Sequence, residues 1–323
     1  MKKWLPAVAL AVALVGSLSV GATQIDNFWS ALLSPGSNEI LWQIRFPRVT
    51  AAVIVGAALG VAGLLAQGAC NNAVAEPAIL GTAAGASFGA VIAISAGFVE
   101  VGTIGAIACG TIGALLTTSL TFKLAALRGA LSSFTLIIVG IAVSAIFTSF
   151  VGIAAAMVSR ADARSISFWS LGSLALVTSE NLLGMAITTA IGIAIAWKIA
   201  PALDRLSLGD ATAFHLGVNV ARIRLVALIA LSILAGGAVS TVGSIAFIGL
   251  AAPHIARFIY GPAHRNLVAH SAIMGGLIVV VADTASRTIA QPNELPIGLA
   301  TALLGAPVLI ALVAVKNNVW RTQ

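Results

Sequence analysis

The sequence predicts an all-α polytopic membrane protein, in which ten transmembrane helices form a single domain over residues 1–323. Of its 323 residues, 59% are hydrophobic and only 8% are charged, whereas about 25% of the residues of an ordinary soluble domain are charged. The apolar runs are continuous and do not alternate with period two, which favours helices over a β-barrel. Together with a mean hydropathy of +1.07, this composition excludes a soluble enzyme and a disordered chain.

A transmembrane helix needs about 20 mostly apolar residues, and the sequence contains ten candidate segments. Two spacings, Gly56-xxx-Gly60 and Gly81-xxx-Gly85-xxx-Gly89, place small residues on one helix face and indicate close helix packing. The expected helices cover residues 4–22, 49–69, 79–97, 101–122, 132–157, 181–200, 223–242, 245–260, 268–286 and 296–315.

The first segment has an alternative interpretation. Lys2 and Lys3, the apolar stretch after them and the small residues at 20–22 also resemble a secretory signal with its cleavage site. In both interpretations the segment runs from the inside to the outside, so the expected topology of the remaining chain is the same.

The distribution of charge predicts the orientation. With the N-terminus in the cytoplasm, most of the 17 lysine and arginine residues fall on the cytoplasmic side, which obeys the positive-inside rule and places both termini in the cytoplasm. The net charge of +7 does not indicate a nucleic-acid partner, because the basic residues form no stripe along which a phosphate backbone could lie. Five arginines fall on the outer side: Arg45, Arg48, Arg160, Arg164 and Arg287.

The expected helices contain few ionisable residues, and this argues against an ion-coupled transporter. Asp283 is the main exception, and its spacing from Arg287 is that of a structural i,i+4 ion pair. The chain has no G-x-x-x-x-G-K-[ST] motif for ATP phosphates, so energy for uphill transport must come from another subunit. The four histidines and two cysteines show no metal-site spacing, and we expect no metal centre.

The longest inner connection runs over residues 200–224 and is unusually apolar for a solvated loop. Residues 208–218 are compatible with a short helix that ends at Gly217, a common C-terminal stop. Composition alone leaves two equal interpretations: a docking helix for a cytoplasmic partner, or a helix that lies on the membrane surface.

Five strings share a recognisable order along nearly the whole chain. They are R-F-P-R at 45–48, Q-G-A-C-N-N-A-V-A-E-P-A-I-L-G at 67–81, F-I-G-L followed by P-H-I-A-R within 247–257, A-D-T at 282–284, and E-L-P-I-G with T-A-L-L-G-A-P within 294–307. In order and spacing they resemble the FecCD family, the permease subunits of type II ABC importers for iron chelates, haem and vitamin B12. One departure is N-N-A-V-A-E-P at 71–77, where the family commonly has R-N-P-L-A-D-P, so that this chain lacks the basic residue and the first proline of that loop.

The resemblance implies the type II ABC importer permease fold and a role in transport rather than catalysis. The expected assembly contains a second copy or a related permease, two cytoplasmic ABC ATPase subunits and an extracytoplasmic solute-binding protein, in the bacterial plasma (inner) membrane. ATP and Mg would be used by the ATPase, and no cofactor is expected on this chain. The expected cargo is an iron chelate, with a ferric siderophore first and haem or cobalamin next.

The resemblance also implies three groups of functional residues. Arg45, Arg48 and Arg287 would dock the binding protein, although composition alone equally allows them to anchor helix ends at the headgroups. The inner gate would contain Asn72, Val74, Ser132 and Ser133. The coupling helix, within about 205–219, would contact the ATPase through Leu208, Gly209, Asp210, Ala211, Ala213, Phe214, Leu216 and Gly217.

Two other functions remain as alternatives at this point. A secondary transporter of a small solute would not need ATP, and a membrane scaffold or sensor would not transport at all.

Overall fold

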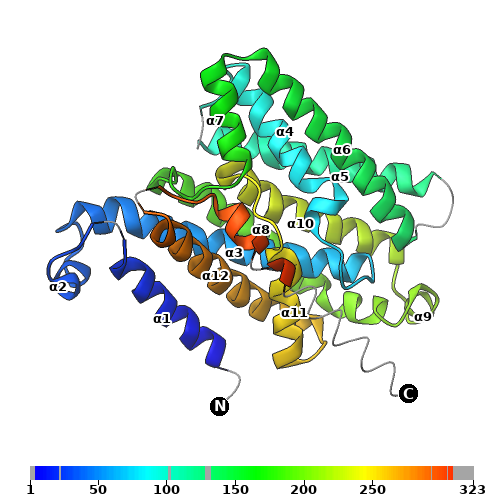
Figure 1. The fold of residues 1–323 in the computed structure, drawn as a ribbon. Coiled ribbons are helices and arrows are strands. Elements are labelled where there is room, and N and C mark those ends of the chain that lie inside the picture. Colours follow the sequence, from blue (N-terminus) through cyan, green and yellow to red (C-terminus); the bar gives the residue numbers. More distant parts are fainter. Residues whose placement is uncertain are drawn as a thin grey trace.

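The computed structural model describes residues 4–21, 23–100, 103–127, 132–291, 293–303 and 305–307, and the regular secondary structure within them is entirely helical (Figure 1). This confirms the expected all-α class. Six helical stretches in the described residues are long and apolar enough to cross a membrane: Ile40–Ala69 (η1 and α3), α5 Ile104–Ala126, α6 Ser133–Met157, α8 Ser179–Leu206, α10 Val220–Val242 and α12 His264–Ile289.

Each of the ten expected segments overlaps a helix, but four of these helices are shorter than a full crossing. They are α1 Leu5–Ser19, α4 Thr82–Ser95, α11 Ile248–Tyr260 and an apolar helix over Ile297–Pro307. The last expected segment continues beyond 307, where it lies outside the described residues. Ten crossings therefore remain a prediction, while six are supported by helix length and composition.

Several elements were not expected from the apolar pattern. The π-helical turn η1 Ile40–Arg45 leads directly into α3 Phe46–Ala69, which lengthens that helix at its start. The others are short: α2 Phe28–Leu33, the 3-10 turn η2 Pro77–Leu80, which overlaps the start of the expected segment 79–97, and α7 Arg160–Ser170. The short helix α9 Asp210–His215, in contrast, lies within residues 208–218, where the sequence predicts a short helix.

The two long helices α3 and α10 form the buried centre (Figure 1). α3 packs against α12, α10, α8 and α11, while α10 packs against α5, α8, α3 and α4. The chain therefore uses one arrangement twice: a buried long helix is followed by a short helix and a long one, in α3–α4–α5 and again in α10–α11–α12. Each short helix packs against the central helix of the other half, α4 against α10 and α11 against α3.

Glycine allows the closest of these contacts. A Cβ on Gly56 would collide with the carbonyl of Gly275 on α12, and one on Gly60 would collide with the carbonyl of Ser271. Between α4 and α5, a Cβ on Gly85 would collide with the carbonyl of Gly113. The close packing expected from the glycine spacings is therefore confirmed, since backbones approach where side chains are absent.

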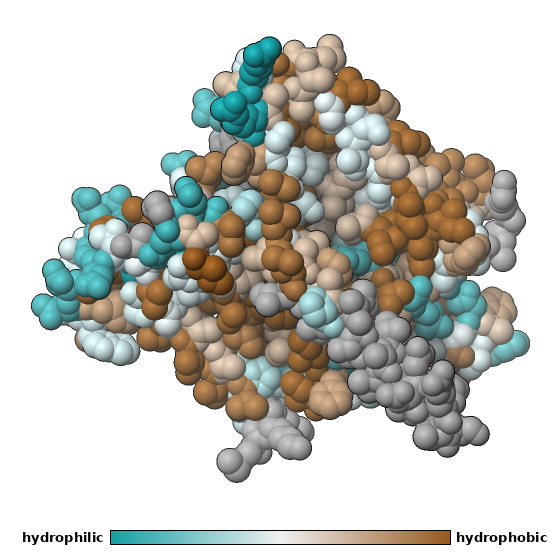
Figure 2. Space-filling model, in the orientation of Figure 1, coloured by the Kyte–Doolittle hydropathy of each residue, from teal (hydrophilic) through white to brown (hydrophobic). Residues whose placement is uncertain are grey.

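Apolar side chains cover most of the face seen in Figure 2, while hydrophilic residues gather over α2, near α7 and beside α9. Large exposed apolar residues lie along spanning helices, as Ile112 and Leu116 do on α5 and Ile138 and Ile141 do on α6. This distribution suits a lipid environment, because a water-soluble protein rarely exposes apolar patches of this extent.

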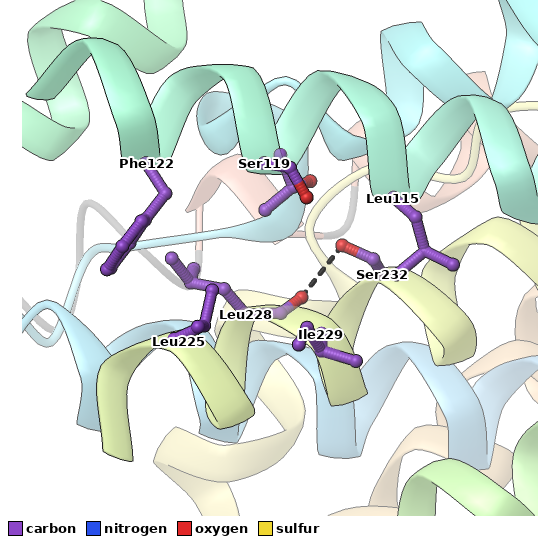
Figure 3. Close-up of a pocket in the computed structure, with 8 residues that line it drawn as sticks. Leu115, Ser119, Phe122, Leu225, Leu228, Ile229 and Ser232 are labelled. Carbon is purple, nitrogen blue, oxygen red and sulfur yellow. Dashed lines mark hydrogen bonds between the residues drawn. The ribbon is translucent and has the colours of Figure 1, made fainter. Parts of the chain in front are cut away.

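The shallow pocket in Figure 3 belongs to the packing between α5 and α10. Leu115 and Phe122 of α5 face Leu225 and Leu228 of α10 across it. The hydroxyl of Ser232 donates to the carbonyl of Leu228 at 2.7 Å, so its hydrogen-bonding capacity is used within its own helix. We interpret this pocket as a seam between two helices rather than a ligand site.

Candidate functional site

The expected short helix on the long connection is present as α9, and its last turn explains why it stops. Gly217 has a φ of +79°, which glycine adopts without the penalty of a Cβ. The N–H of Gly217 donates to the carbonyl of Phe214 at 3.0 Å, and the N–H of Val218 donates to that of Ala213 at 2.9 Å. This is the Schellman pattern of a helix C-terminus, so the expected stop at Gly217 is confirmed.

α9 buries one face and exposes apolar side chains on the other. Ala213 is fully buried, whereas Leu208, Phe214 and Leu216 are 61%, 70% and 50% exposed. Gly209, with a φ of +99°, and Gly217 stand in open space at the two ends of the helix. An ordered helix with exposed apolar residues on it and directly beside it provides a surface for a partner or a membrane.

A buried arginine, Arg224 on α10, connects α9 to two other segments. Its side chain is 2% exposed, and its Nη2 lies 2.9 Å from Oδ1 of Asp210 on α9. Its Nε donates to the carbonyl of Ala69 at 2.9 Å, and its Nη2 contacts Oγ of Ser133 at 3.4 Å. These contacts were not expected from the sequence, in which Arg224 counts only as a cytoplasmic positive charge. One signal was available, since this arginine falls inside the expected apolar segment 223–242.

The expected gate residues lie on the two segments that Arg224 contacts. Asn72 follows α3, and its Oδ1 accepts a hydrogen bond from the N–H of Val74 at 3.0 Å, while Val74 is half exposed. Ser132 is the N-cap of α6 and accepts from the N–H of Thr135 at 3.1 Å. Ser133 is the first residue of α6. The structure thus brings Ser133 to the end of α3 through the Arg224 guanidinium.

Two of the three arginines expected to dock a binding protein are buried against the end of α1. Arg45 donates from Nη1 to the carbonyls of Leu18 and Ser19 at 2.8 and 2.9 Å. Arg287 donates from Nη1 to the carbonyl of Val20 at 2.7 Å. The last carbonyls of a helix have no partner within it, so these two guanidinium groups satisfy the C-terminal end of α1 and join it to α3 and α12.

The third arginine forms ion pairs within the chain. Arg48 contacts both carboxylate oxygens of Asp283, at 2.9 Å from Nη2 and 3.2 Å from Nε, and its Nη1 lies 2.9 Å from Glu294. Asp283 also pairs with Arg287 at 3.4 Å, which confirms the expected i,i+4 pair. All three arginines are thus directed into the chain, and docking through them stays a prediction that requires these bonds to be exchanged.

The strings that are far apart in sequence meet in space. Both terminal nitrogens of Arg257 donate to Oε1 of Gln67 at 3.1 Å, and Nε2 of Gln67 donates to the carbonyl of Gly249 at 3.3 Å. Glu76 accepts a hydrogen bond from the N–H of Phe247 at 2.9 Å, directly before α11. The segments 67–81 and 247–257 therefore support one another. In the described residues, no group of three His, Cys, Asp or Glu side chains is placed to hold a metal ion.

Comparison with known proteins decides the family. The sequence pattern of the FecCD transport family matches residues 9–315, nearly the whole chain. The chain belongs to the FecCD transport family. The relatives in this family are transport permease subunits and not enzymes.

Several curated relatives in this family are permeases of import systems. FhuB of the iron(3+)-hydroxamate import system of Bacillus subtilis is 38% identical over 298 residues, which cover 90% of this chain and 77% of FhuB. HmuU of the hemin transport system of Yersinia pestis is 34% identical, with 95% and 93% covered. FepD of the ferric enterobactin transport system of Escherichia coli is 36% identical, with 94% and 91% covered.

A solved structure shares the fold. It is described as an inward-facing conformation of a metal-chelate type ABC transporter, and it matches this FecCD chain with a TM-score of 0.81 and 28% identity. The match covers 96% of this chain and 98% of that one. The expected fold of an ABC transporter permease is therefore supported over nearly the whole chain.

Proposed function

We propose that this chain is the permease subunit of an ABC importer in the bacterial plasma membrane, and that it forms the translocation path for an iron chelate. The match to the FecCD family over residues 9–315 carries the proposal. A ferric siderophore is the first candidate cargo, because relatives named for iron-hydroxamate and ferric enterobactin are similar along most of this chain. Haem and cobalamin are next, since relatives named for hemin and vitamin B12 are also similar.

The proposed assembly contains this permease with a second copy or a related chain, two ATPase subunits at the cytoplasmic face and a solute-binding protein at the other face. We place the α9 end in the cytoplasm, with both termini on that side. Basic residues in the last turns of α5, α8 and α11 support this orientation: Lys123, Arg205 and Arg257.

In this assembly α9 is the coupling helix that contacts the ATPase. Its exposed Leu208, Phe214 and Leu216 support this assignment, since they suit burial in a groove of a partner. Asn72, Val74, Ser132 and Ser133 are the proposed inner gate, because small or polar side chains can close a path without placing a permanent charge in it.

The test is uptake into proteoliposomes that contain the permease and its ATPase subunits, with a loaded binding protein on the accessible face. We expect ATP-dependent accumulation of radiolabelled iron supplied as a ferric hydroxamate, and little accumulation when the ATPase carries an inactivating substitution. Hemin and cobalamin, supplied through the same binding protein, distinguish the cargoes. Uptake that is driven by an imposed ion gradient and does not depend on ATP would identify a secondary transporter and refute the proposal.

A further inference from the structure

We propose that Arg224 is the positioning residue through which a displacement of α9 reaches both segments of the inner gate. The proposal rests on the proposed function, in which α9 contacts the ATPase and the ends of α3 and α6 form the gate. Its structural basis is one buried guanidinium that contacts three segments distant in sequence: Asp210, Ala69 and Ser133.

The geometry of the guanidinium makes these three contacts interdependent. The group is planar, and its donors have a fixed relation to one another. The Nη2 atom lies 2.9 Å from Oδ1 of Asp210 and 3.4 Å from Oγ of Ser133, while Nε donates to the carbonyl of Ala69 at 2.9 Å. When Asp210 moves and the guanidinium follows, the bonds to Ala69 and Ser133 must change as well.

Burial of the Arg224 guanidinium explains why it would move together with Asp210. The Arg224 side chain is 2% exposed, whereas that of Asp210 is 49% exposed. Separating a buried charge from its partner is strongly unfavourable, because the charge loses its pairing without regaining water. A shift of α9 therefore moves the pair together more readily than it breaks the pair.

α9 is built to shift as a unit. Gly209 and Gly217 flank it, both have positive φ, and a Cβ at either position would meet no atom within 4 Å. The helix between them is closed by its own hydrogen bonds, including that from Val218 to Ala213. Glycines in open space allow the ends of the segment to rotate, while the Asp210–Arg224 pair connects the segment to the bundle.

The other two contacts lie at the gate itself. Ala69 is the last residue of α3, three positions before Asn72, and its carbonyl belongs to the last turn, where helix carbonyls lack partners within the helix. Ser133 is the first residue of α6 and belongs to the proposed gate. One side chain thus contacts the end of one gate helix and the start of the other.

The experiment uses the complete importer in proteoliposomes, with its ATPase subunits and a binding protein loaded with ferric hydroxamate. The variants are Arg224→Lys, Asp210→Asn and the double variant, and Arg222→Lys is the control because Arg222 is exposed on the same helix. Three quantities are measured: ATP hydrolysed per iron imported, retention of the ATPase by the permease, and nucleotide-dependent maleimide labelling of Asn72→Cys. The labelling background carries Cys70→Ala and Cys109→Ala.

We expect Arg224→Lys and Asp210→Asn each to raise the ATP hydrolysed per iron imported by about fivefold or more. The ATPase should remain bound, and the change in labelling at Asn72→Cys between nucleotide states should disappear. The double variant should hydrolyse no more ATP per iron imported than either single variant, because both substitutions remove the same Asp210–Arg224 contact. Arg222→Lys should behave as the wild type.

Wild-type stoichiometry and labelling in Arg224→Lys would overturn the proposal, as would additive effects in the double variant. Should Arg224→Lys fail to fold, Asp210→Asn tests the proposal in its place. This variant should fold, since Asp210 is half exposed and an asparagine side chain has nearly the same shape as that of aspartate. Normal coupling in Asp210→Asn then overturns the proposal. If the wild-type importer shows no ATP-dependent uptake, the proposed function and this inference are both refuted. If the wild type and the variants hydrolyse the same amount of ATP per iron imported, the inference alone is refuted.

Discussion

At the scale of single residues, buried arginines determine how the helix ends are joined. Arg45 and Arg287 satisfy the last carbonyls of α1, and Arg48 lies bidentate on Asp283, whose side chain is 1% exposed. Because of these contacts, the substitution Arg48→Glu would affect folding as well as any contact with a binding protein. A glutamate there would face the buried Asp283 and cost about 3–5 kcal/mol of folding stability, so weaker docking of a binding protein by Arg48→Glu would not by itself show a docking contact.

Arg287→Gln separates the anchoring role from the docking role. We expect it to lower the stability of the folded permease by about 1.5–3 kcal/mol, because charge-assisted bonds to the end of α1 are lost. Thermal unfolding in detergent measures this, with Arg160→Gln as the control because Arg160 is exposed on the side predicted to be outer. An unchanged melting temperature with weaker binding-protein affinity would instead support docking.

At the scale of elements, α9 depends on the backbone of its flanking glycines more than on packing. Gly217 has positive φ, and a Cβ added there would meet no atom within 4 Å, so a substitution acts through conformation and not through collision. The same element connects to the gate segments through Asp210 and Arg224. Its conformation is therefore the feature that a functional test should change.

Gly217→Val should uncouple ATP hydrolysis from uptake while leaving membrane insertion intact. A left-handed conformation costs an L-residue about 1–2 kcal/mol, and a β-branched side chain suffers more than most, so the end of α9 should shift. Gly217→Asn is the matched control, because asparagine tolerates positive φ. Uptake and ATP hydrolysis are measured together, and equal coupling in the two variants would contradict the role of this turn.

Cysteines at the gate should report its movement. We expect Asn72→Cys and Ser133→Cys to change their reactivity towards a polar maleimide when the ATPase binds nucleotide. Both variants again carry Cys70→Ala and Cys109→Ala, although we expect the native Cys70 to react slowly, because burial raises the pKa of its thiol to about 11. The unmodified chain tests that background, and identical labelling of both variants in every nucleotide state would argue against these positions as gates.

At the scale of the whole molecule, the two halves are held together by helices whose backbones approach closely. α3 meets α12 of the other half along Gly56, Gly60 and Gly275, while α4 meets α5 within its own half along Gly85 and Gly113. Apolar side chains cannot distinguish a neighbouring helix from lipid, so close packing of small residues supplies the specificity of these contacts.

Gly56→Ala should destabilise the folded chain by about 1–3 kcal/mol, because the added methyl group meets the carbonyl of Gly275 in a packed interface. Gly152→Ala on α6 is the control, since a Cβ there meets nothing within 4 Å. Thermal unfolding and the yield of monodisperse protein measure the difference. Equal stability of the two variants would show that α3 and α12 can separate without cost.

The sequence by itself determined the class, the family and the positions of the apolar segments, because lipid imposes length and hydropathy on every segment that crosses it. It also predicted α9 and its stop at Gly217, since a helix C-terminus depends on local residues. Glycine spacing likewise predicted close packing, although not which helices would meet.

Only the tertiary structure decided the partners of the charged residues. Arg48 pairs with Asp283, and Arg224 joins Asp210 to the ends of α3 and α6, across separations that no local pattern encodes. Expected outer arginines proved to be buried against α1, because the unpaired carbonyls of that helix lie within their reach. A long side chain finds its partner through the packing of whole helices, and that packing exists only once the chain has folded.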